Sequence, residues 1–223
     1  MTQYDALGSS YDVIETLPFK ILELHNVFLA IRTLLHSGMT VFDVACGTGY
    51  YCSRLLSWGA SSVTGIDISS SMLSAASVRL SSSIDSGCAR FVLADGKQPQ
   101  SFTPDHRPNY FDVVFVAHVR QYWQNLKPGG VFLGVVPHPS ENMNQRAKAY
   151  GKEPLNRLWP RNEYTRELES GEGWDLHVFL NDDGVDFSTW HLKKEVYEQA
   201  ARDGGMKGKL EWKREIFPGN EWK

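Results

Sequence analysis

The chain has 223 residues, of which 42% are hydrophobic and 22% are charged, and its formal net charge is −3. This length is typical of one large domain, and the composition is that of a folded globular protein rather than a disordered one. The slightly acidic balance, with a pI near 6.2, argues against a protein that binds nucleic acid or an anionic membrane surface.

Four further classes of protein are disfavoured by local features of the sequence. No apolar run approaches the roughly 18 residues that a membrane span needs, and the first residues show no secretory signal. Cys46, Cys52 and Cys88 are odd in number and lack CxxC spacing, which fits neither a disulfide framework nor a zinc site. We therefore expect a cytoplasmic protein without a bound metal.

The first predicted element is a helix over residues 17–36. Pro18 lies at its start and Gly38 just past its end, as helix termini prefer. One apolar stripe is expected to face the core, formed by Ile21, Leu24, Phe28, Ile31 and Leu35. An apolar run over residues 40–45 then predicts a buried strand, and a glycine turn leads into a short helix over residues 50–58.

Strands and helices continue to alternate through the first half of the chain. Further strands are expected over residues 62–66, 90–94, 111–116 and 131–136. A Ser-rich helix starts near residue 69, and Lys-Pro-Gly-Gly at 127–130 is expected to form the turn into the last strand. This alternation predicts an α/β fold, with a doubly wound, mostly parallel sheet and helices on both of its faces.

The second half of the sequence is less regular. Residues 137–170 are polar and show no long apolar stripe. Residues 174–180 and 185–190 flank Asn-Asp-Asp-Gly and predict an antiparallel hairpin. A helix is expected over residues 193–203, and a half-buried strand over residues 209–216.

The carboxyl ends of the first two strands carry the residues of a candidate site. The first strand ends in Asp-x-x-x-Gly-x-Gly, which places Asp43, Gly47 and Gly49 before a helix. Glycines let a ligand approach the backbone, and the helix N-terminus offers free N–H groups to a negative group. Asp67 ends the next strand, where a carboxylate can accept hydrogen bonds from both hydroxyls of a ribose.

The glycine pattern also argues against a dinucleotide site. Cys52 stands where the dinucleotide fingerprint needs its third glycine. Asp43 would repel a pyrophosphate, but it suits a cationic amine. The sequence therefore favours a nucleoside that bears an amino acid.

The ordered motifs resemble those of the class I S-adenosylmethionine-dependent methyltransferases. The likeness covers residues 40–136 and is carried by VFDVACGTG at 41–49, VTGIDIS at 63–69 followed by Met72, FVLADG at 91–96, FDVV at 111–114 and LKPGG at 126–130. The N-terminal part resembles more loosely the small-molecule branch, which includes quinone-type and secondary-metabolite enzymes.

The resemblance implies a Rossmann-like fold and S-adenosylmethionine as cofactor, with S-adenosylhomocysteine as product. The residues that it assigns to cofactor binding are Tyr11, Asp43, Ala45, Gly47, Gly49, Asp67, Ile68, Met72, Asp95, Gly96 and Ala117.

Individual roles follow from the same resemblance. Gly47 and Gly49 would lie at the amino-acid end of the cofactor, with Asp43 near its ammonium group. Asp67 would hold the ribose hydroxyls. The adenine would be lined by Ile68 and Met72 and bound by Asp95, whereas Ala117 would lie under the sulfonium and Tyr11 would close the pocket.

His118 directly follows the fourth strand and is the candidate general base. A histidine that only orients the substrate, or that is satisfied by a backbone hydrogen bond, is the alternative. Methyl transfer from a sulfonium depends mainly on positioning, so a reaction without a base also stays open. Weaker candidates for the base are His25, His138, Tyr122 and Tyr164.

Two departures from the family concern the substrate side. Only about nine residues separate the fourth strand from the turn before the fifth, which predicts a short helix over 118–126 and an open active-site side. The final antiparallel strand of the family has no counterpart after residue 216. Either the hairpin at 174–190 fills that sheet edge, or the edge is left for a second copy or another partner chain.

We expect a single methyltransferase domain over residues 1–223. Its parts would be a helical cap at 1–38, a cofactor-binding core at 39–136, a variable substrate-side segment at 137–192, and a C-terminal helix and strand at 193–223. The expected activity is methyl transfer to an oxygen, nitrogen, carbon or sulfur atom of a small molecule, with secondary metabolism as one setting. The alternatives are a protein of this fold that binds the cofactor without methylating, and a nicotinamide oxidoreductase.

Overall fold

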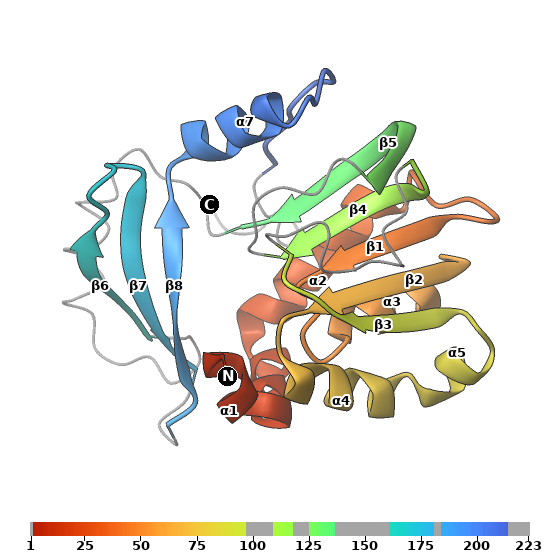
Figure 1. The fold of residues 1–223 in the computed structure, drawn as a ribbon, viewed down its shortest axis with the longest axis horizontal. Helices are drawn as coiled ribbons and strands as arrows, with labels where there is room; N and C mark the ends of the chain where they lie inside the picture. Colours follow the sequence, from red (N-terminus) through yellow and green to blue (C-terminus); the bar gives the residue numbers. More distant parts are fainter. Residues whose placement is uncertain (1, 97–108, 118–124, 137–160, 181–183, 214–223) are drawn as a thin grey trace, which may run out of the picture.

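The computed structural model describes residues 2–96, 109–117, 125–136, 161–180 and 184–213. These residues form two sheets, one with five strands and one with three. The carboxyl ends of the strands in the larger sheet point toward the smaller sheet (Figure 1).

The larger sheet is parallel throughout. Its strands, in spatial order, are β3 (Ala89–Leu93), β2 (Ser62–Asp67), β1 (Thr40–Val44), β4 (Phe111–Ala117) and β5 (Leu126–Val135). The chain runs outward from β1 to β3 and then returns to β4 on the other side of β1. Such a reversal of strand order is where doubly wound sheets bind their ligands. The predicted α/β fold with a doubly wound parallel sheet is confirmed.

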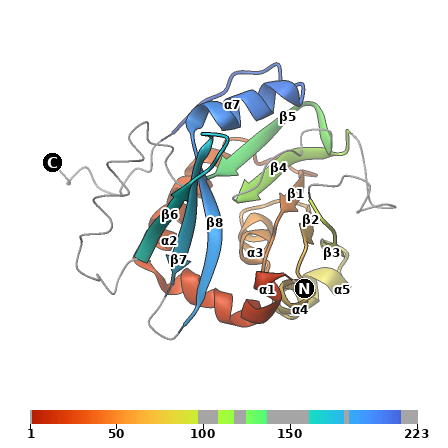
Figure 2. The same ribbon diagram turned by 60° about the vertical axis from the view of Figure 1, so that its left-hand side comes forward.

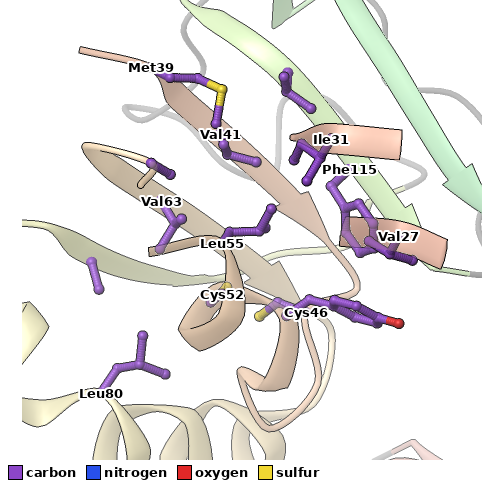
Figure 3. Packing of buried hydrophobic residues seen from close by; sticks show 14 of the residues in the cluster. Val27, Ile31, Met39, Val41, Cys46, Cys52, Leu55, Val63, Leu80 and Phe115 are labelled. Atoms are coloured by element: carbon purple, nitrogen blue, oxygen red, sulfur yellow. The ribbon is translucent and has the colours of Figure 1, made fainter. Parts of the chain in front are cut away.

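Helices cover one face of this sheet. They are α2 (Pro18–Ile31), α3 (Tyr50–Ser57) and α4 (Ser70–Arg79), and α5 (Ser81–Asp85) continues from α4. Figure 3 shows Val41, Val63 and Phe115 of the strands in one cluster with Leu55 of α3 and Ile31 of α2. Since successive strand residues point to opposite faces, these strand residues all lie on the helix-covered side.

The buried face of α2 differs from the prediction. Ile21, which was expected in the apolar stripe, is 68% exposed, whereas Leu22 and Val27, which were not, are at most 7% exposed. Ile31 of the predicted stripe is fully buried. Helix α2 is apolar on most sides, so periodicity alone could not select the face that packs. The helix also ends at Ile31 rather than at residue 36, but Leu34 and Leu35 still pack against the core from the turn that follows.

The opposite face of the parallel sheet has its own apolar cluster. Phe42, Val44, Val114 and Val116 are each at most 2% exposed, and the rings of Phe42 and Phe111 stack with centroids 4.8 Å apart. The connections that follow β3 and β4, residues 97–108 and 118–124, lie outside the described residues. The predicted short helix over 118–126 falls on the second of these segments, except for residues 125 and 126, and Leu126 belongs to β5.

Strand β5 begins earlier than predicted. Leu126 already pairs with Phe111, and regular pairing resumes at Val131, so residues 127–130 form an irregular bulge inside the strand. Gly129 has a φ of 81°, in the left-handed region that favours glycine. The predicted Lys-Pro-Gly-Gly turn is thus this bulge. Leu126 belongs to the strand because its side chain packs in the same apolar cluster as Phe111.

The smaller sheet is antiparallel, with the order β6 (Arg161–Glu167), β7 (Gly173–Phe179) and β8 (Asp186–Leu192). The predicted hairpin is the pair β7–β8. Strand β6 was not predicted, since its sequence is mostly polar and shows little alternation. The hairpin does not fill the edge of the parallel sheet, and within the described residues no strand pairs with the outer edge of β5.

The predicted helix near residue 193 is α7 (Lys194–Asp203). The strand predicted over 209–216 is wrong for residues 209–213, which form neither helix nor strand, while 214–216 lie outside the described residues. Trp212 instead packs back on α7. Its indole Nε1 donates to Glu198 Oε1 at 2.8 Å, and its ring centroid lies 6.0 Å from that of Tyr197.

The N-terminal segment links the two sheets. It consists of α1 (Gln3–Leu7) and the 3₁₀ helix η1 (Gly8–Thr16). The Gln3 amide exchanges two hydrogen bonds, of 2.7 and 3.0 Å, with the backbone of Ser188 in β8. Leu17 packs into the apolar cluster of the antiparallel sheet. Figures 1 and 2 show α1 at one end of that sheet and α7 at the other.

None of the helices in the described segments combines the length and the apolar character that crossing a bilayer requires.

Candidate functional site

The chain leaves β1 through a turn with three left-handed residues: Ala45, Gly47 and Gly49, with φ values of 56°, 54° and 78°. A Cβ on Gly49 would lie 2.9 Å from Leu80 Cδ1 and 3.1 Å from Ala76 Cβ, so this glycine lets the start of α3 pack directly on α4. A Cβ on Gly47 would meet no atom within 4 Å. The backbone at Gly47 therefore borders open space that a ligand can occupy.

The carboxylate of Asp67 joins the end of β2 to this turn. It accepts a hydrogen bond from the backbone N–H of Gly47 at 2.9 Å and another from that of Ser69 at 2.9 Å. Asp67 is 8% exposed, and this burial raises its pKa, although the backbone donors act in the opposite direction. The structure thus brings together two of the predicted site residues, which are twenty positions apart.

Asp43 lies beneath the same turn. It is 1% exposed, and burial raises its pKa to about 7, although the Cys52 thiol donates to its Oδ2 at 3.1 Å and favours the charged form. Cys52 is the residue at the third-glycine position of a dinucleotide fingerprint. Its side chain is fully buried against Asp43, so the turn is built differently from one that binds a pyrophosphate.

Two charged residues of α2 were missed by the sequence analysis. Lys20 and Glu23 are each 8% exposed, and Lys20 Nζ lies 2.5 Å from Glu23 Oε1. The hydroxyl of Tyr51, at the start of α3, donates to the same Oε1. Both residues lie off the predicted apolar stripe of this helix.

Tyr11 lies near the acidic residues of the site. Burial raises its pKa, as do the neighbouring Tyr4 hydroxyl and the charges of Glu23 and Asp67. Its ring centroid lies 6.4 Å from that of Tyr4 and 5.7 Å from that of Phe187 in β8. Tyr11 therefore connects the end of β2 with the antiparallel sheet.

The N-terminal helix α1 is fastened beside Asp67. The hydroxyl of Ser69 donates to Asp5 Oδ1 at 2.7 Å, and that of Ser71 lies 3.2 Å from the backbone oxygen of Tyr4 and 3.1 Å from that of Asp5. Ser69 also caps α4, because its hydroxyl accepts from the N–H of the third residue of that helix at 3.3 Å. These bonds hold the N-terminal segment over the start of α4.

The predicted adenine side is partly open. Ile68 is 48% exposed and Leu93, at the end of β3, is 56% exposed, so two large apolar side chains are uncovered at neighbouring strand ends. Met72 is 2% exposed and lies within the packed interior. Asp95 and Gly96 follow Ala94, the residue after β3, whose backbone N–H donates to the backbone oxygen of Asp67 at 2.9 Å.

The predicted sulfonium side is only partly described. Ala117 is the last residue of β4 and pairs with Val135 of β5. His118, the candidate base, lies outside the described residues, as do Tyr122 and His138. The role of His118 stays a prediction.

The two other weaker candidates are described. His25 is a partly exposed residue of α2. Tyr164 of β6 has its hydroxyl 2.6 Å from Nδ1 of His191, a β8 residue that is 1% exposed. The sequence analysis did not single out His191, because its burial depends on a sheet whose third strand was not predicted.

Comparison with known proteins agrees with this geometry. Residues 41–130 match a family model described as "Methyltransferase domain". The matched segment runs from β1 through the glycine turn, Asp67 and Asp95 to the bulge of β5. A search of curated proteins found no significant match.

Three solved structures illustrate the likeness. The PH0226 protein from Pyrococcus horikoshii OT3 is 17% identical over 91% of this chain and 89% of its own, with a TM-score of 0.58. An S-adenosylmethionine dependent methyltransferase from Mesorhizobium loti is 21% identical over 80% of each chain, with a TM-score of 0.46. The [4+2]-cyclase SpnF is 25% identical over 51% of this chain, with a TM-score of 0.41, and the match spans only 42% of its length.

Of these three structures, the Pyrococcus protein is similar enough to support the fold. Its similarity agrees with the parallel sheet and its flanking helices. The family match adds the motifs of the glycine turn and of the strand ends. Over residues 41–130 the chain therefore matches the methyltransferase domain model, on a parallel sheet with the strand order β3-β2-β1-β4-β5.

Proposed function

We propose that this protein binds S-adenosylmethionine and transfers its methyl group to a small-molecule acceptor, with S-adenosylhomocysteine as the product. The observation that carries the proposal is the hydrogen bond between Asp67 and the backbone of Gly47. It joins the acidic end of β2 to the glycine turn after β1, at the point where the strand order of the sheet reverses.

The residues around this hydrogen bond suit the parts of such a cofactor. A carboxylate offers about four acceptor positions, more than the N–H groups of Gly47 and Ser69 occupy, so Asp67 can also accept from ribose hydroxyls. The exposed side chains of Ile68 and Leu93 offer an apolar surface to the adenine ring. The open space at Gly47 and the acidic Asp43 suit the amino-acid end.

When bound, S-adenosylmethionine supplies an electrophilic methyl group on a sulfonium. The chain contributes binding and orientation, because an in-line displacement gains most from holding the reacting atoms in line. The acceptor would lie between the carboxyl ends of the parallel strands and the antiparallel sheet, which face each other in Figure 1. Where the acceptor must lose a proton, His118 is the proposed general base.

The organisation of the chain is proposed in the same terms. Residues 1–38 would form the cap, 39–136 the cofactor core, 137–192 the substrate side and 193–223 the C-terminal part of one domain. The outer edge of β5, unpaired within the described residues, leaves room for a second copy or a partner chain. The charge balance disfavours nucleic acid as acceptor, and we propose a cytoplasmic location and a role in secondary metabolism on the sequence grounds given above.

The direct test is a methyl-transfer assay. The protein is incubated with S-adenosylmethionine labelled in its methyl group and a panel of small oxygen, nitrogen, carbon and sulfur nucleophiles. We expect a labelled product together with an equal amount of S-adenosylhomocysteine, and loss of both in an Asp67→Ala variant. Cofactor binding without product across the whole panel would favour the non-methylating alternative.

A further inference from the structure

Helix α2 brings a positive charge to the glycine turn. Lys20 is a charged residue in a largely apolar helix, yet it is only 8% exposed. Its Nζ lies 2.5 Å from Glu23 Oε1, one helical turn further along. Burying an ion pair costs several kcal/mol of desolvation free energy for each ion, and the attraction between the two charges often does no more than offset this cost. A contribution to stability alone therefore explains the pair poorly.

The ammonium group of Lys20 lies over the start of α3. It is 4.5 Å from the ring centroid of Tyr51 and 5.2 Å from that of Tyr50, the first two residues of that helix. Both tyrosines directly follow the glycine turn at residues 47–49. Lys20 also acts electrostatically on Asp43, at the end of β1. These contacts place the charge near Asp43 and the start of α3, at the amino-acid end of the proposed cofactor site.

The ammonium group has hydrogen-bonding capacity to spare. It carries three N–H donors. Among the described residues, the acceptor within hydrogen-bond distance is Glu23 Oε1, which also accepts from the Tyr51 hydroxyl. The first turn of α3 likewise has no side-chain cap for its N–H groups. An anion bound between Lys20 and this turn would satisfy both sets of donors.

We propose that Lys20 binds the carboxylate of the amino-acid end of the cofactor, an inference that rests on the proposed function. An α-amino acid carries one charge of each sign. Asp43 and Lys20, which interact electrostatically, offer an acidic group for the amine and a cation for the carboxylate. In this arrangement Glu23 and Tyr51 are positioning residues, since they hold the ammonium group over the start of α3.

The test compares two ligands in two proteins by isothermal titration calorimetry. The ligands are S-adenosylhomocysteine and its decarboxylated analogue, which keeps the amine but lacks the carboxylate. The proteins are the wild type and Lys20→Met. We expect the substitution to weaken S-adenosylhomocysteine binding about ten-fold or more, as for the loss of one charged hydrogen bond, and to change binding of the analogue less than about two-fold.

A matched control is available on α7. Lys194 also pairs with a glutamate on its own helix, Glu198 at 3.4 Å, and lies over an aromatic ring, that of Trp212 at 5.9 Å. It lies at the other end of the antiparallel sheet from α1, so Lys194→Met is expected to leave the affinity for both ligands unchanged.

A second variant guards against a failure to fold, because Lys20→Met leaves the Glu23 charge buried and unpaired. The double variant Lys20→Met/Glu23→Gln removes that charge and keeps an acceptor for Tyr51. It is expected to show the same loss of S-adenosylhomocysteine affinity. The wild type alone gives a reading that does not depend on folding of a variant, since it must bind the decarboxylated analogue at least about ten-fold more weakly than S-adenosylhomocysteine.

The outcomes separate the inference from the function on which it rests. Equal affinity of the wild type for the two ligands, or an equal loss for both ligands in the Lys20 variants, overturns the assignment of Lys20 and leaves the cofactor site standing. A wild type that binds neither ligand overturns the proposed function, and the inference with it.

Discussion

The carboxylate of Asp67 accepts a hydrogen bond from the backbone N–H of Gly47 at 2.9 Å, so the ends of two neighbouring strands are linked through a side chain. Strands β1 and β2 pair in parallel register up to Val44 and Ile66, and the linkage lies directly beyond the last pair. The glycine turn is therefore held in place by the same carboxylate that is proposed to bind the ribose. Changes at Asp67 are expected to affect both the turn and the ligand.

The first prediction concerns that carboxylate. Asp67→Ala is expected to weaken S-adenosylhomocysteine binding by about 1.5–3 kcal/mol for each charged hydrogen bond lost to the ribose. Calorimetric titration measures this loss. A suitable control is Asp186→Ala, which removes a carboxylate 2.9 Å from His177 in the antiparallel sheet and is expected to leave the affinity unchanged. Undiminished affinity in Asp67→Ala would remove the ribose assignment.

The two glycines of the turn are expected to respond differently to alanine. At Gly49 the new Cβ would press on Leu80 and Ala76, so Gly49→Ala is expected to lower the free energy of unfolding by about 1–3 kcal/mol. At Gly47 the new Cβ would meet no protein atom, so the loss of stability is limited to the left-handed backbone, about 1–2 kcal/mol.

The difference between these variants should appear in binding. The Cβ of Gly47→Ala would project into the open space assigned to the cofactor, so S-adenosylhomocysteine affinity should fall more than thermal stability does. Chemical denaturation and calorimetry of both variants check this. A Gly47→Ala protein with wild-type affinity would show that the space beside Gly47 is not the cofactor site.

Asp43 is expected to make the stability depend on pH. Its pKa in the folded protein is raised to about 7 by burial, whereas an aspartate in an unfolded chain has a pKa of about 3.9. The folded state therefore binds this proton more tightly, so the stabilisation is fully present below about pH 4 and is lost as the pH rises to about 7. The slope approaches about 1.4 kcal/mol of unfolding free energy for each pH unit.

The variant Asp43→Asn tests this dependence, because asparagine keeps the shape and an acceptor for the Cys52 thiol but does not titrate. Urea unfolding over the same pH range should give a flatter curve for the variant, with the larger gain in its stability relative to wild type at the higher pH values. Parallel curves for the two proteins would mean that Asp43 is not protonated in the folded state.

A further prediction concerns the amino-terminal ends of the strands, opposite the proposed cofactor site. Asp112 accepts from Thr40 N at 2.8 Å, from Thr40 Oγ1 at 2.9 Å and from Lys127 Nζ at 2.7 Å, so it joins the amino-terminal ends of β1, β4 and β5. Asp112→Ala is expected to cost about 2 kcal/mol of stability, as for the loss of charge-assisted hydrogen bonds. Cofactor affinity should not change, since the site lies at the other ends of these strands.

The control for Asp112 is Asp175→Ala, which removes the partner of an exposed arginine, Arg166 at 2.9 Å. An exposed pair of this kind contributes about 0–1 kcal/mol. Denaturation curves for both variants separate the two cases. Equal and small effects would show that Asp112 does not hold the strand starts together.

The core of the fold could be predicted because its strands have a recognisable sequence pattern. Continuous apolar runs mark β1 and β4, and buried strands of a parallel sheet have that pattern. The meeting of Asp67 and Gly47 also followed from sequence, since both lie at the carboxyl ends of strands that were expected to be parallel. Motif order was thus enough to assemble this half of the site.

Other parts depended on contacts that no local pattern contains. Lys20 and Glu23 are buried because α3 supplies a tyrosine hydroxyl and two aromatic rings from another part of the chain. Strand β6 is stabilised by backbone pairing with β7, so its polar side chains gave no signal. The alternation of polar and apolar residues at 209–213 predicted a strand. Trp212 instead donates a hydrogen bond to Glu198 of α7, a contact that the local pattern does not contain.

The measurement that tests the assignment of the cofactor site most directly is a paired calorimetric titration of the full chain with S-adenosylhomocysteine and with NADH. A site built from the Asp67–Gly47 linkage, with Asp43 beneath the turn, should bind one S-adenosylhomocysteine per chain and should not bind NADH. Tight binding of NADH without binding of S-adenosylhomocysteine would contradict the assignment and favour a nicotinamide oxidoreductase.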